Sequence, residues 1–234
     1  MKIKEFFVSY FTRAEKILWI LSVLSILVFH FLFGEGGALS LCASLIGVTA
    51  LIFCAKGNPV GQLLMICFSL CYGVISFRAR YYGEMITYLG MSAPMALLSL
   101  IAWLRNPYAK GESKQVKVNQ GMSRKEIGFM AILTVAVSVA FYFILDLFGT
   151  ANLLISTLSV TTSFGAVYLT YRRSPYFALV YGLNDLVLIL LWALAAKDDP
   201  SCLAVLVCFV AFFANDTYSF INWQRMRRIQ REML

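Results

Sequence analysis

The stretch YFALVYGLNDLVLILLWALA at positions 176–195 decides the fold, because its 20 residues include a single charged side chain, Asp185. A membrane-spanning helix needs about 20 apolar residues, whereas a membrane β-strand needs only about 9–11. Backbone groups in lipid must find their hydrogen-bond partners within the protein, which a helix achieves on its own. The stretch is therefore predicted to be a transmembrane helix.

Seven further apolar runs of similar length flank this stretch. The sequence is 60% hydrophobic and 14% charged, whereas a soluble domain averages about 25% charged residues. We therefore expect an all-α, polytopic membrane protein with about eight transmembrane helices, and a water-soluble enzyme is excluded. The predicted helices lie at about 14–33, 38–55, 62–77, 85–104, 128–148, 151–171, 176–195 and 201–222.

The positions of the basic residues predict the orientation of these helices. Seventeen of the 20 Lys and Arg residues fall on one predicted side, which carries both termini and the long linker between the fourth and fifth helices. The other side has Arg78, Arg80 and Lys197. Because cytoplasmic loops carry the excess of Lys and Arg, both termini are expected in the cytoplasm. This distribution also accounts for the net charge of +8 without a nucleic acid partner.

Short matches between the two halves of the chain predict an internal repeat. Asn58-Pro59 precedes the third helix as Ser174-Pro175 precedes the seventh, and Trp103 and Trp223 end the fourth and eighth helices. Helices two to four thus pair with helices six to eight, and helix five supplies the crossing that makes the repeats parallel. Repeats of this kind suggest a transporter with its ligand site between the halves.

The repeat predicts five units along the chain. Residues 1–37 form an N-terminal cytoplasmic segment and an extra transmembrane helix, and residues 38–105 form the first three-helix bundle. A cytoplasmic linker and a linker helix follow at 106–150. The second three-helix bundle lies at 151–223, and a basic cytoplasmic tail at 224–234 ends the chain.

Polar side chains within the predicted helices are the candidates for ligand binding. An ionised Asp in the middle of a membrane costs about 2.5–3.5 kcal/mol on insertion scales, so Asp185 and Asp216 suggest a functional interior. Asp216 precedes Arg225 by only nine residues, which leaves a position near the cytoplasmic surface open. Amides and aromatic rings that share a helix face suit a neutral polar ligand with a flat ring. The predicted substrate-binding residues are Gln62, Tyr72, Tyr88, Tyr181, Asn184, Asp185, Trp192, Asn215, Tyr218 and Asn222.

Other interpretations of these polar residues are weaker. Each Asn or Gln could simply join two helices, which is worth about 0.6 kcal/mol on average. The six cysteines lie in apolar runs without a CxxC pair, and the chain has one His, so neither a metal centre nor a cofactor is expected. No P-loop is present, which argues against an ATP-driven pump. The hydroxyl side chains of the sixth helix are predicted to pack it against its neighbours.

Three segments resemble the nicotinamide riboside transporter (PnuC) family, over about residues 38–223. The last predicted helix, with Asn215-Asp216-Thr217-Tyr218 before Trp223, is similar to the family's last helix. Gly83-Glu84-Met85 with the later Pro94 and Trp103 resembles its fourth helix, and Gly182-Leu183-Asn184-Asp185 resembles the polar break in its seventh.

The resemblance implies facilitated uptake of nicotinamide riboside, an NAD precursor and form of vitamin B3, across a bacterial cytoplasmic membrane. It also implies two three-helix bundles joined by a linker helix, an architecture similar to the SWEET sugar transporters. In this family a cytoplasmic kinase traps the ligand by phosphorylation, so ion coupling is not required. Relatives that carry thiamine, riboflavin or deoxynucleosides keep these ligands open as alternatives, and homo-oligomer formation is left open as well.

Two functions of other classes compete with transport. An intramembrane aspartyl protease could use Asp185 and Asp216 as a dyad that shares a proton and activates water. The residues before Asp185 do not follow the Gly-x-Gly pattern of such proteases, and no Pro-Ala-Leu segment is present. A non-transporting membrane scaffold is disfavoured by the repeat and by the polar faces of the helices.

Overall fold

The computed structural model describes residues 10–33, 37–78, 82–108, 115–150, 152–200 and 202–233. Within these residues the chain is helical, apart from turns and an isolated bridge between Pro107 and Val116. The helices, in chain order, are α2 (Arg13–Phe33), α3 (Gly37–Ala55), α4 (Val60–Arg78), α5 (Tyr82–Ile86), the π-helix η1 (Thr87–Ser92), α6 (Ala93–Leu104), α7 (Arg124–Leu147), α8 (Leu153–Tyr171), α9 (Phe177–Ala195) and α10 (Cys202–Glu232).

Eight helical segments among the described residues are long and apolar enough to cross a membrane. One of them, Gly83–Leu104, combines α5, η1 and α6. Its π-helix lies directly before Pro94, which has no N–H to donate and whose ring disturbs regular α-helical bonding. The predicted all-α, polytopic architecture is therefore confirmed, with an irregular fourth span that the sequence pattern did not indicate.

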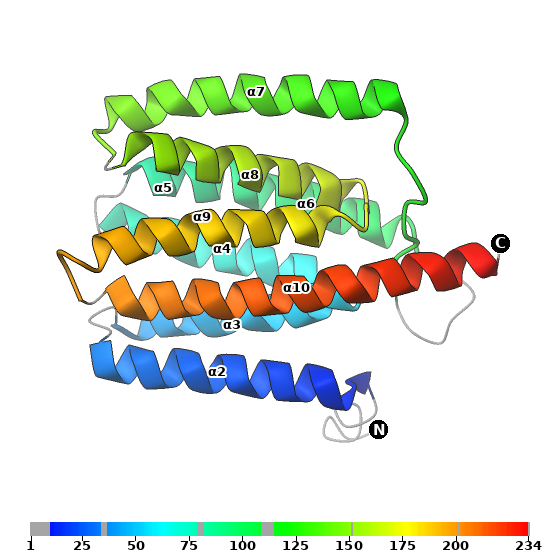
Figure 1. Ribbon diagram of the computed structural model, residues 1–234, viewed down its shortest axis with the longest axis horizontal. Helices are drawn as coiled ribbons and strands as arrows, with labels where there is room; N and C mark the ends of the chain where they lie inside the picture. The colour runs from blue at the N-terminus through cyan, green and yellow to red at the C-terminus, as the bar shows by residue number, and fades with distance from the viewer. Residues whose placement is uncertain are drawn as a thin grey trace.

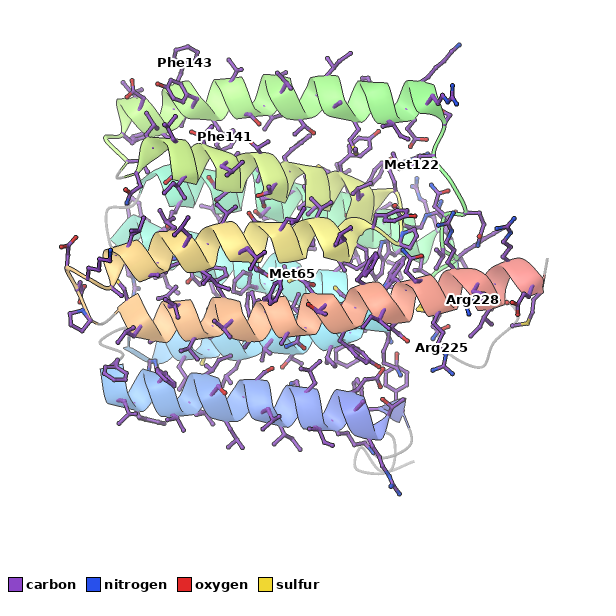
Figure 2. The ribbon with its side chains drawn as sticks, viewed as in Figure 1. Met65, Met122, Phe141, Phe143, Arg225 and Arg228 are labelled. Atoms are coloured by element: carbon purple, nitrogen blue, oxygen red, sulfur yellow. The ribbon has the colours of Figure 1, made fainter. Side chains whose placement is uncertain are left out.

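The helices run side by side, with α2 and α7 at opposite edges of the molecule (Figure 1). Between these edges, α3, α4 and α5–α6 form one bundle, and α8, α9 and α10 form the other. The third helix of each bundle packs on the first helix of the other, since α6 contacts α8 and α10 contacts α3. On α7, Phe141 packs toward α8 whereas Phe143 points away from the protein, as expected for a lipid-facing helix (Figure 2).

The last helix differs from its prediction, because α10 continues to Glu232 where the apolar run ends near residue 222. The continuation is polar on average, but one face stays buried through Trp223, Met226 and Gln230. Arg225 and Arg228 lie on this extension beyond the other helices (Figure 2). The predicted basic tail at 224–234 is thus a helix through residue 232, held by packing that hydropathy does not report.

Candidate functional site

A central cavity of about 90 Å³ lies between the two bundles, with walls from both of them. Met65 of α4 lines it and is labelled near the middle of the molecule in Figure 2. Apolar side chains form much of the wall, and polar groups are set among them, as is usual for small-molecule sites. The polar lining residues are Gln62, Ser69, Tyr88, Ser92, Ser99, Ser163, Thr170, Tyr181, Asn184, Asp185 and Asp216.

Five of the ten predicted binding residues line this central cavity: Gln62, Tyr88, Tyr181, Asn184 and Asp185. They come from α4 and η1 in the first bundle and from α9 in the second. On α9 the i, i+3, i+4 spacing of the last three places them on one face, as the sequence pattern predicted. Helical periodicity was therefore sufficient to find the wall that α9 contributes.

The two intramembrane aspartates meet in this cavity. Asp185 and Asp216 are 3% and 2% exposed, and both line it. The two carboxyl groups, one from α9 and one from α10, line the same buried space. One oxygen of each, Oδ2 of Asp185 and Oδ1 of Asp216, is buried without a hydrogen-bond partner. Asp216 is therefore buried within the protein, and it belongs with the lining although it was absent from the predicted set.

Tyr72 and Trp192 support the cavity from outside its lining. The Tyr72 ring contacts Phe68 and Tyr88, with ring centroids 5.1 and 4.8 Å apart. Trp192 packs against the same apolar cluster, which includes Phe212 of α10. Tyr88 and Phe68 line the cavity. Tyr72 and Trp192 therefore hold the wall in position but do not line the cavity themselves.

The predicted polar face of α10 is turned toward α2 and α3, away from the cavity. Asn215 Nδ2 donates to Ser22 Oγ of α2 at 2.9 Å. Asn222 Nδ2 donates to the carbonyl oxygen of Ala55, at the end of α3, at 2.8 Å. The Tyr218 side chain also points away from the cavity, and its hydroxyl hydrogen-bonds to Glu15 of α2. The physical reason is that α2, which stands outside the bundles, covers this face of α10 and supplies its polar partners.

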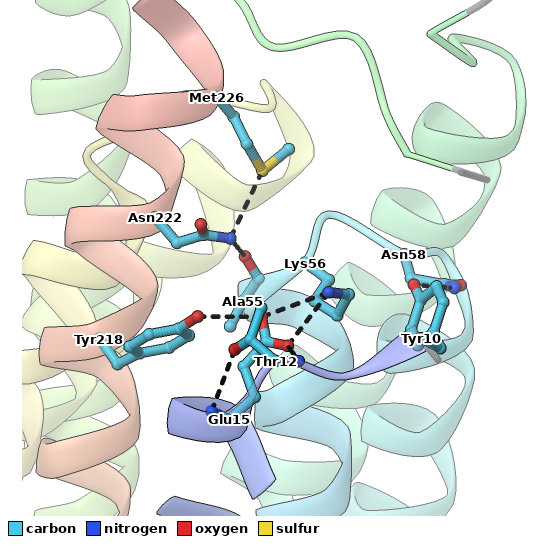
Figure 3. A network of polar contacts seen from close by, with 9 residues as sticks. All are labelled: Tyr10, Thr12, Glu15, Ala55, Lys56, Asn58, Tyr218, Asn222 and Met226. Atoms are coloured by element: carbon cyan, nitrogen blue, oxygen red, sulfur yellow. Dashed lines mark hydrogen bonds and ion pairs between the residues drawn. The ribbon is translucent and has the colours of Figure 1, made fainter. Parts of the chain in front are cut away.

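Tyr218 belongs to a buried polar network near the start of α2 (Figure 3). Its hydroxyl donates to Glu15 Oε1 at 2.9 Å, and Lys56 Nζ lies 3.1 Å from Glu15 Oε2. Thr12 and Glu15 form a capping box at the first turn of α2, with each side chain accepting the other's backbone N–H. Glu15 is 1% exposed. The network ties α2 to both bundles and leaves these groups unavailable to a ligand.

Helix α8 has both a packing face and a cavity face. Thr161 Oγ1 donates to Ser138 Oγ of α7 at 2.7 Å, which is the packing role that was predicted for these hydroxyls. Thr162 Oγ1 instead donates to Asn184 Oδ1 at 2.8 Å and orients that amide. Ser163 lines the central cavity. The sequence analysis missed the last two, because hydroxyl side chains are common on helix–helix interfaces and carry no further signal.

A second cavity of about 90 Å³ adjoins the first, and Tyr88, Ser92, Ser163 and Asn184 line both. It extends toward the end of the molecule opposite the termini, where Glu84 contributes to its wall. Glu84 shares a helix face with Tyr88 by its i, i+4 spacing. The two cavities together run from Glu84 to the Asp185–Asp216 pair.

Two buried tryptophans lie behind the lining of the central cavity, because Phe177, which lines it, packs against both rings. Trp103 Nε1 donates to the carbonyl oxygen of Thr170 in α8, and Trp223 Nε1 donates to that of Cys54 in α3, each at 2.9 Å. Both indoles are fully buried, with ring centroids 5.3 Å apart. Each tryptophan thus joins the third helix of its own bundle to the first helix of the other.

The linker segment 115–122 lies over these tryptophans. Val116 and Val118 are buried in the same apolar cluster. The N–H of Val116 donates to the carbonyl oxygen of Gly57, and the N–H of Asn119 donates to that of Arg173. Gly57 and Arg173 follow α3 and α8, and both have left-handed backbone, with φ of 65° and 54°. One short segment therefore fastens the equivalent turns of both bundles.

A family profile described as "Nicotinamide mononucleotide transporter" matches residues 37–225. The chain belongs to this family. The matched range contains both bundles, the linker helix and every residue of the central cavity. The family is one of transporters, so the interpretation of Asp185 and Asp216 as a protease dyad is set aside, and so is a non-transporting scaffold.

Two proteins similar to this chain are named nicotinamide riboside transporter PnuC. The nicotinamide riboside transporter PnuC of Neisseria mucosa is 28% identical over 213 residues, covering 89% of this chain and 80% of that protein. The protein of the same name from Haemophilus influenzae is 21% identical over 228 residues, covering 96% of each. The crystal structure of the vitamin B3 transporter PnuC superimposes with a TM-score of 0.80 at 19% identity, covering 94% of each chain. That structure supports the fold.

Proposed function

We propose that this protein takes up nicotinamide riboside by facilitated diffusion through the central cavity. Membership of the family and the names of the two similar proteins support this ligand. The observation that carries the proposal is the cavity between the bundles, whose amide, carboxyl and hydroxyl groups can bond to ribose hydroxyls and a carboxamide. Tyr88 and Tyr181 offer aromatic rings for a flat heterocycle.

A riboside fits this cavity better than the mononucleotide that the family description names. A phosphate monoester carries about −1.5 to −2 charges at neutral pH and is usually bound by Arg or Lys side chains. Among the described residues that line the two cavities, none is Lys, Arg or His. The carboxyl groups at Glu84, Asp185 and Asp216 would repel a phosphate.

The binding residues in this proposal are the ones that line the cavity. Gln62 and Asn184 supply amides from opposite bundles, and Tyr88, Tyr181 and Asp185 complete the set taken from the sequence. Tyr72, Trp192, Asn215, Tyr218 and Asn222 act on the ligand only through the wall and the helices that they position. This assignment replaces the ligand contacts predicted for α10.

The orientation and cellular setting are part of the same proposal. The excess of basic residues around the termini and the linker supports cytoplasmic termini in the inner membrane of a bacterium. In this orientation Trp103, Trp223 and the linker segment 115–122 close the cytoplasmic end, and they must separate for ligand to leave the cavity. A cytoplasmic kinase that phosphorylates the ligand would keep net uptake favourable.

A binding panel on the purified protein tests this proposal. Nicotinamide riboside should bind, whereas nicotinamide mononucleotide should bind at least about 100-fold more weakly, because a dianionic group meets buried carboxyls without a cation. Thiamine, riboflavin and a deoxynucleoside serve as the competing ligands. Preferred binding of the mononucleotide, or of one of these three, would contradict the proposed ligand.

A further inference from the structure

Among the described residues that line the two cavities, three are acidic and none is basic. Glu84 lines the second cavity, and Asp185 and Asp216 line the central one. In the part of the chain that the structure describes, the ion pairs are Lys56 with Glu15 and Arg172 with Glu126. None of the three cavity acids takes part in an ion pair there.

The two aspartates are placed to act together on a ligand. Both line one buried cavity, and one oxygen of each has no hydrogen-bond partner. Two carboxyl groups in one buried site repel each other when both are ionised, so such a pair shares a proton when it carries a single negative charge. A buried charge without a counter-ion is costly, and a cationic ligand in this cavity would supply the counter-ion.

We propose that the Asp185–Asp216 pair, as a single shared negative charge, is the counter-ion of a cationic ligand and selects it over neutral ligands. The inference rests on the proposed function for placing the ligand in the central cavity. Glu84 adds a second acidic group on the route from the opposite end. The Tyr88 and Tyr181 rings line the same space, and aromatic faces attract cations as well.

The charge of each candidate ligand decides whether a counter-ion at this site favours its binding. Nicotinamide riboside is an N-glycosylated pyridinium and carries a permanent positive charge on its ring. Thiamine has a cationic thiazolium, whereas riboflavin and deoxynucleosides are neutral at pH 7. A counter-ion at this site therefore favours the first two and disfavours the others. The amides and aromatic residues alone had suggested a neutral ligand in the sequence analysis. The proposed counter-ion replaces that expectation with a cationic ligand.

The neutral 1,4-dihydro form of nicotinamide riboside provides a matched ligand for the test. It keeps the ribose and the carboxamide and loses the ring charge. The wild-type protein should bind the cation at least about tenfold more tightly than the dihydro form, the size expected for a charged partner in a partly screened site. Equal affinity for the two forms would overturn the inference and leave the proposed function intact. This comparison needs no variant.

Variants then test whether the charge is shared. In Asp185→Asn or Asp216→Asn, the new amide takes the place of the protonated carboxyl of the pair, and the remaining carboxylate keeps the negative charge. Each single variant should retain the cation preference within about threefold. The double variant should bind both forms with equal affinity. Asp146→Asn on the exposed end of α7 is the matched control, and it should behave as wild type.

The outcomes separate the inference from the function on which it rests. A double variant that binds the neutral form normally and still prefers the cation would overturn the counter-ion role. Loss of the preference in either single variant would overturn the shared charge. If the wild type binds neither form of the riboside but binds thiamine more tightly than its neutral 3-deaza analogue, the proposed ligand is wrong and the counter-ion role is supported.

Discussion

Replacing Gln230 by Leu should release the linker segment 115–122 from the end of the bundle. Gln230 is 3% exposed, although it lies on a polar extension of α10. Its Oε1 accepts from the N–H of Val118 at 2.8 Å, and its Nε2 donates to the carbonyl oxygen of Val116 at 3.1 Å. Leu has a similar size and can make neither bond, so two buried backbone groups lose their partners.

The cost of this change can be worked from these contacts. A buried donor or acceptor left without a partner costs about 1–3 kcal/mol, and partial relaxation of the linker brings the total for two groups to about 2 kcal/mol. A drop of that size in the free energy of local opening corresponds to about thirtyfold faster amide exchange. Hydrogen–deuterium exchange of a peptide that covers 115–122 measures it directly.

The control for this experiment lies on the same helix. Gln224→Leu makes the same chemical change where no hydrogen bond of the side chain is recorded among the described residues, so exchange in 115–122 should stay at the wild-type rate. If Gln230→Leu also leaves the exchange rate unchanged, Gln230 does not hold the linker, and the account of how this end is closed fails.

Three further predictions concern the tryptophans, the amide wall and the topology. Trp103→Phe and Trp223→Phe should each lower the free energy of unfolding by about 1–3 kcal/mol, through one lost hydrogen bond and a smaller ring. The effects should not add in the double variant, because the two rings touch. Clearly unequal effects of the two single variants in thermal denaturation would contradict the equivalent roles of the two tryptophans. Asn184→Ala should weaken ligand binding by about twofold to just over tenfold, at about 0.5–1.5 kcal/mol for a neutral hydrogen bond, while Thr161→Ala leaves the Kd unchanged in the same titration. Gly121→Cys, in a cysteine-free background, should resist an impermeant thiol reagent in intact cells, and labelling from outside would reverse the assigned orientation.

The all-α membrane architecture could be predicted from sequence because it depends on the lengths of apolar runs and on the burial of backbone groups in lipid. The wall formed by α9 could also be predicted, since Tyr181, Asn184 and Asp185 share a face at helical spacing. Both results follow from local properties of the chain. Neither requires knowledge of which helix lies beside which.

The polar face of α10 shows where this reasoning ends. Asn215, Tyr218 and Asn222 have the spacing of a binding face, yet α2 and the end of α3 cover it. Periodicity identifies a polar face but does not say whether a ligand or another helix occupies it. Asp216, one residue from Asn215, lies on the other side and reaches the cavity. The free-energy cost of an acidic residue inside a membrane did identify Asp216 as a functional candidate, and this cost was a better indicator than helical periodicity.

The extension of α10 and the linker illustrate a second limit. Gln230 and Val118 are buried only because two segments more than 100 residues apart come together. Their sequence surroundings are polar and basic, so composition predicts a solvated tail and a loop. Contacts of this kind depend on the assembled bundle, and no pattern within either segment reports them.

Transport in proteoliposomes tests the central claim most directly. With nicotinamide riboside outside and no ion gradient, its internal concentration should rise to the external value and stop there. With the membrane potential held at zero, a proton or sodium gradient should leave that endpoint unchanged. Ser163→Phe, which places a ring where the two cavities meet, should abolish uptake while the protein stays folded. Accumulation above the external concentration at zero membrane potential, or unimpaired uptake by Ser163→Phe, would contradict facilitated diffusion through this cavity.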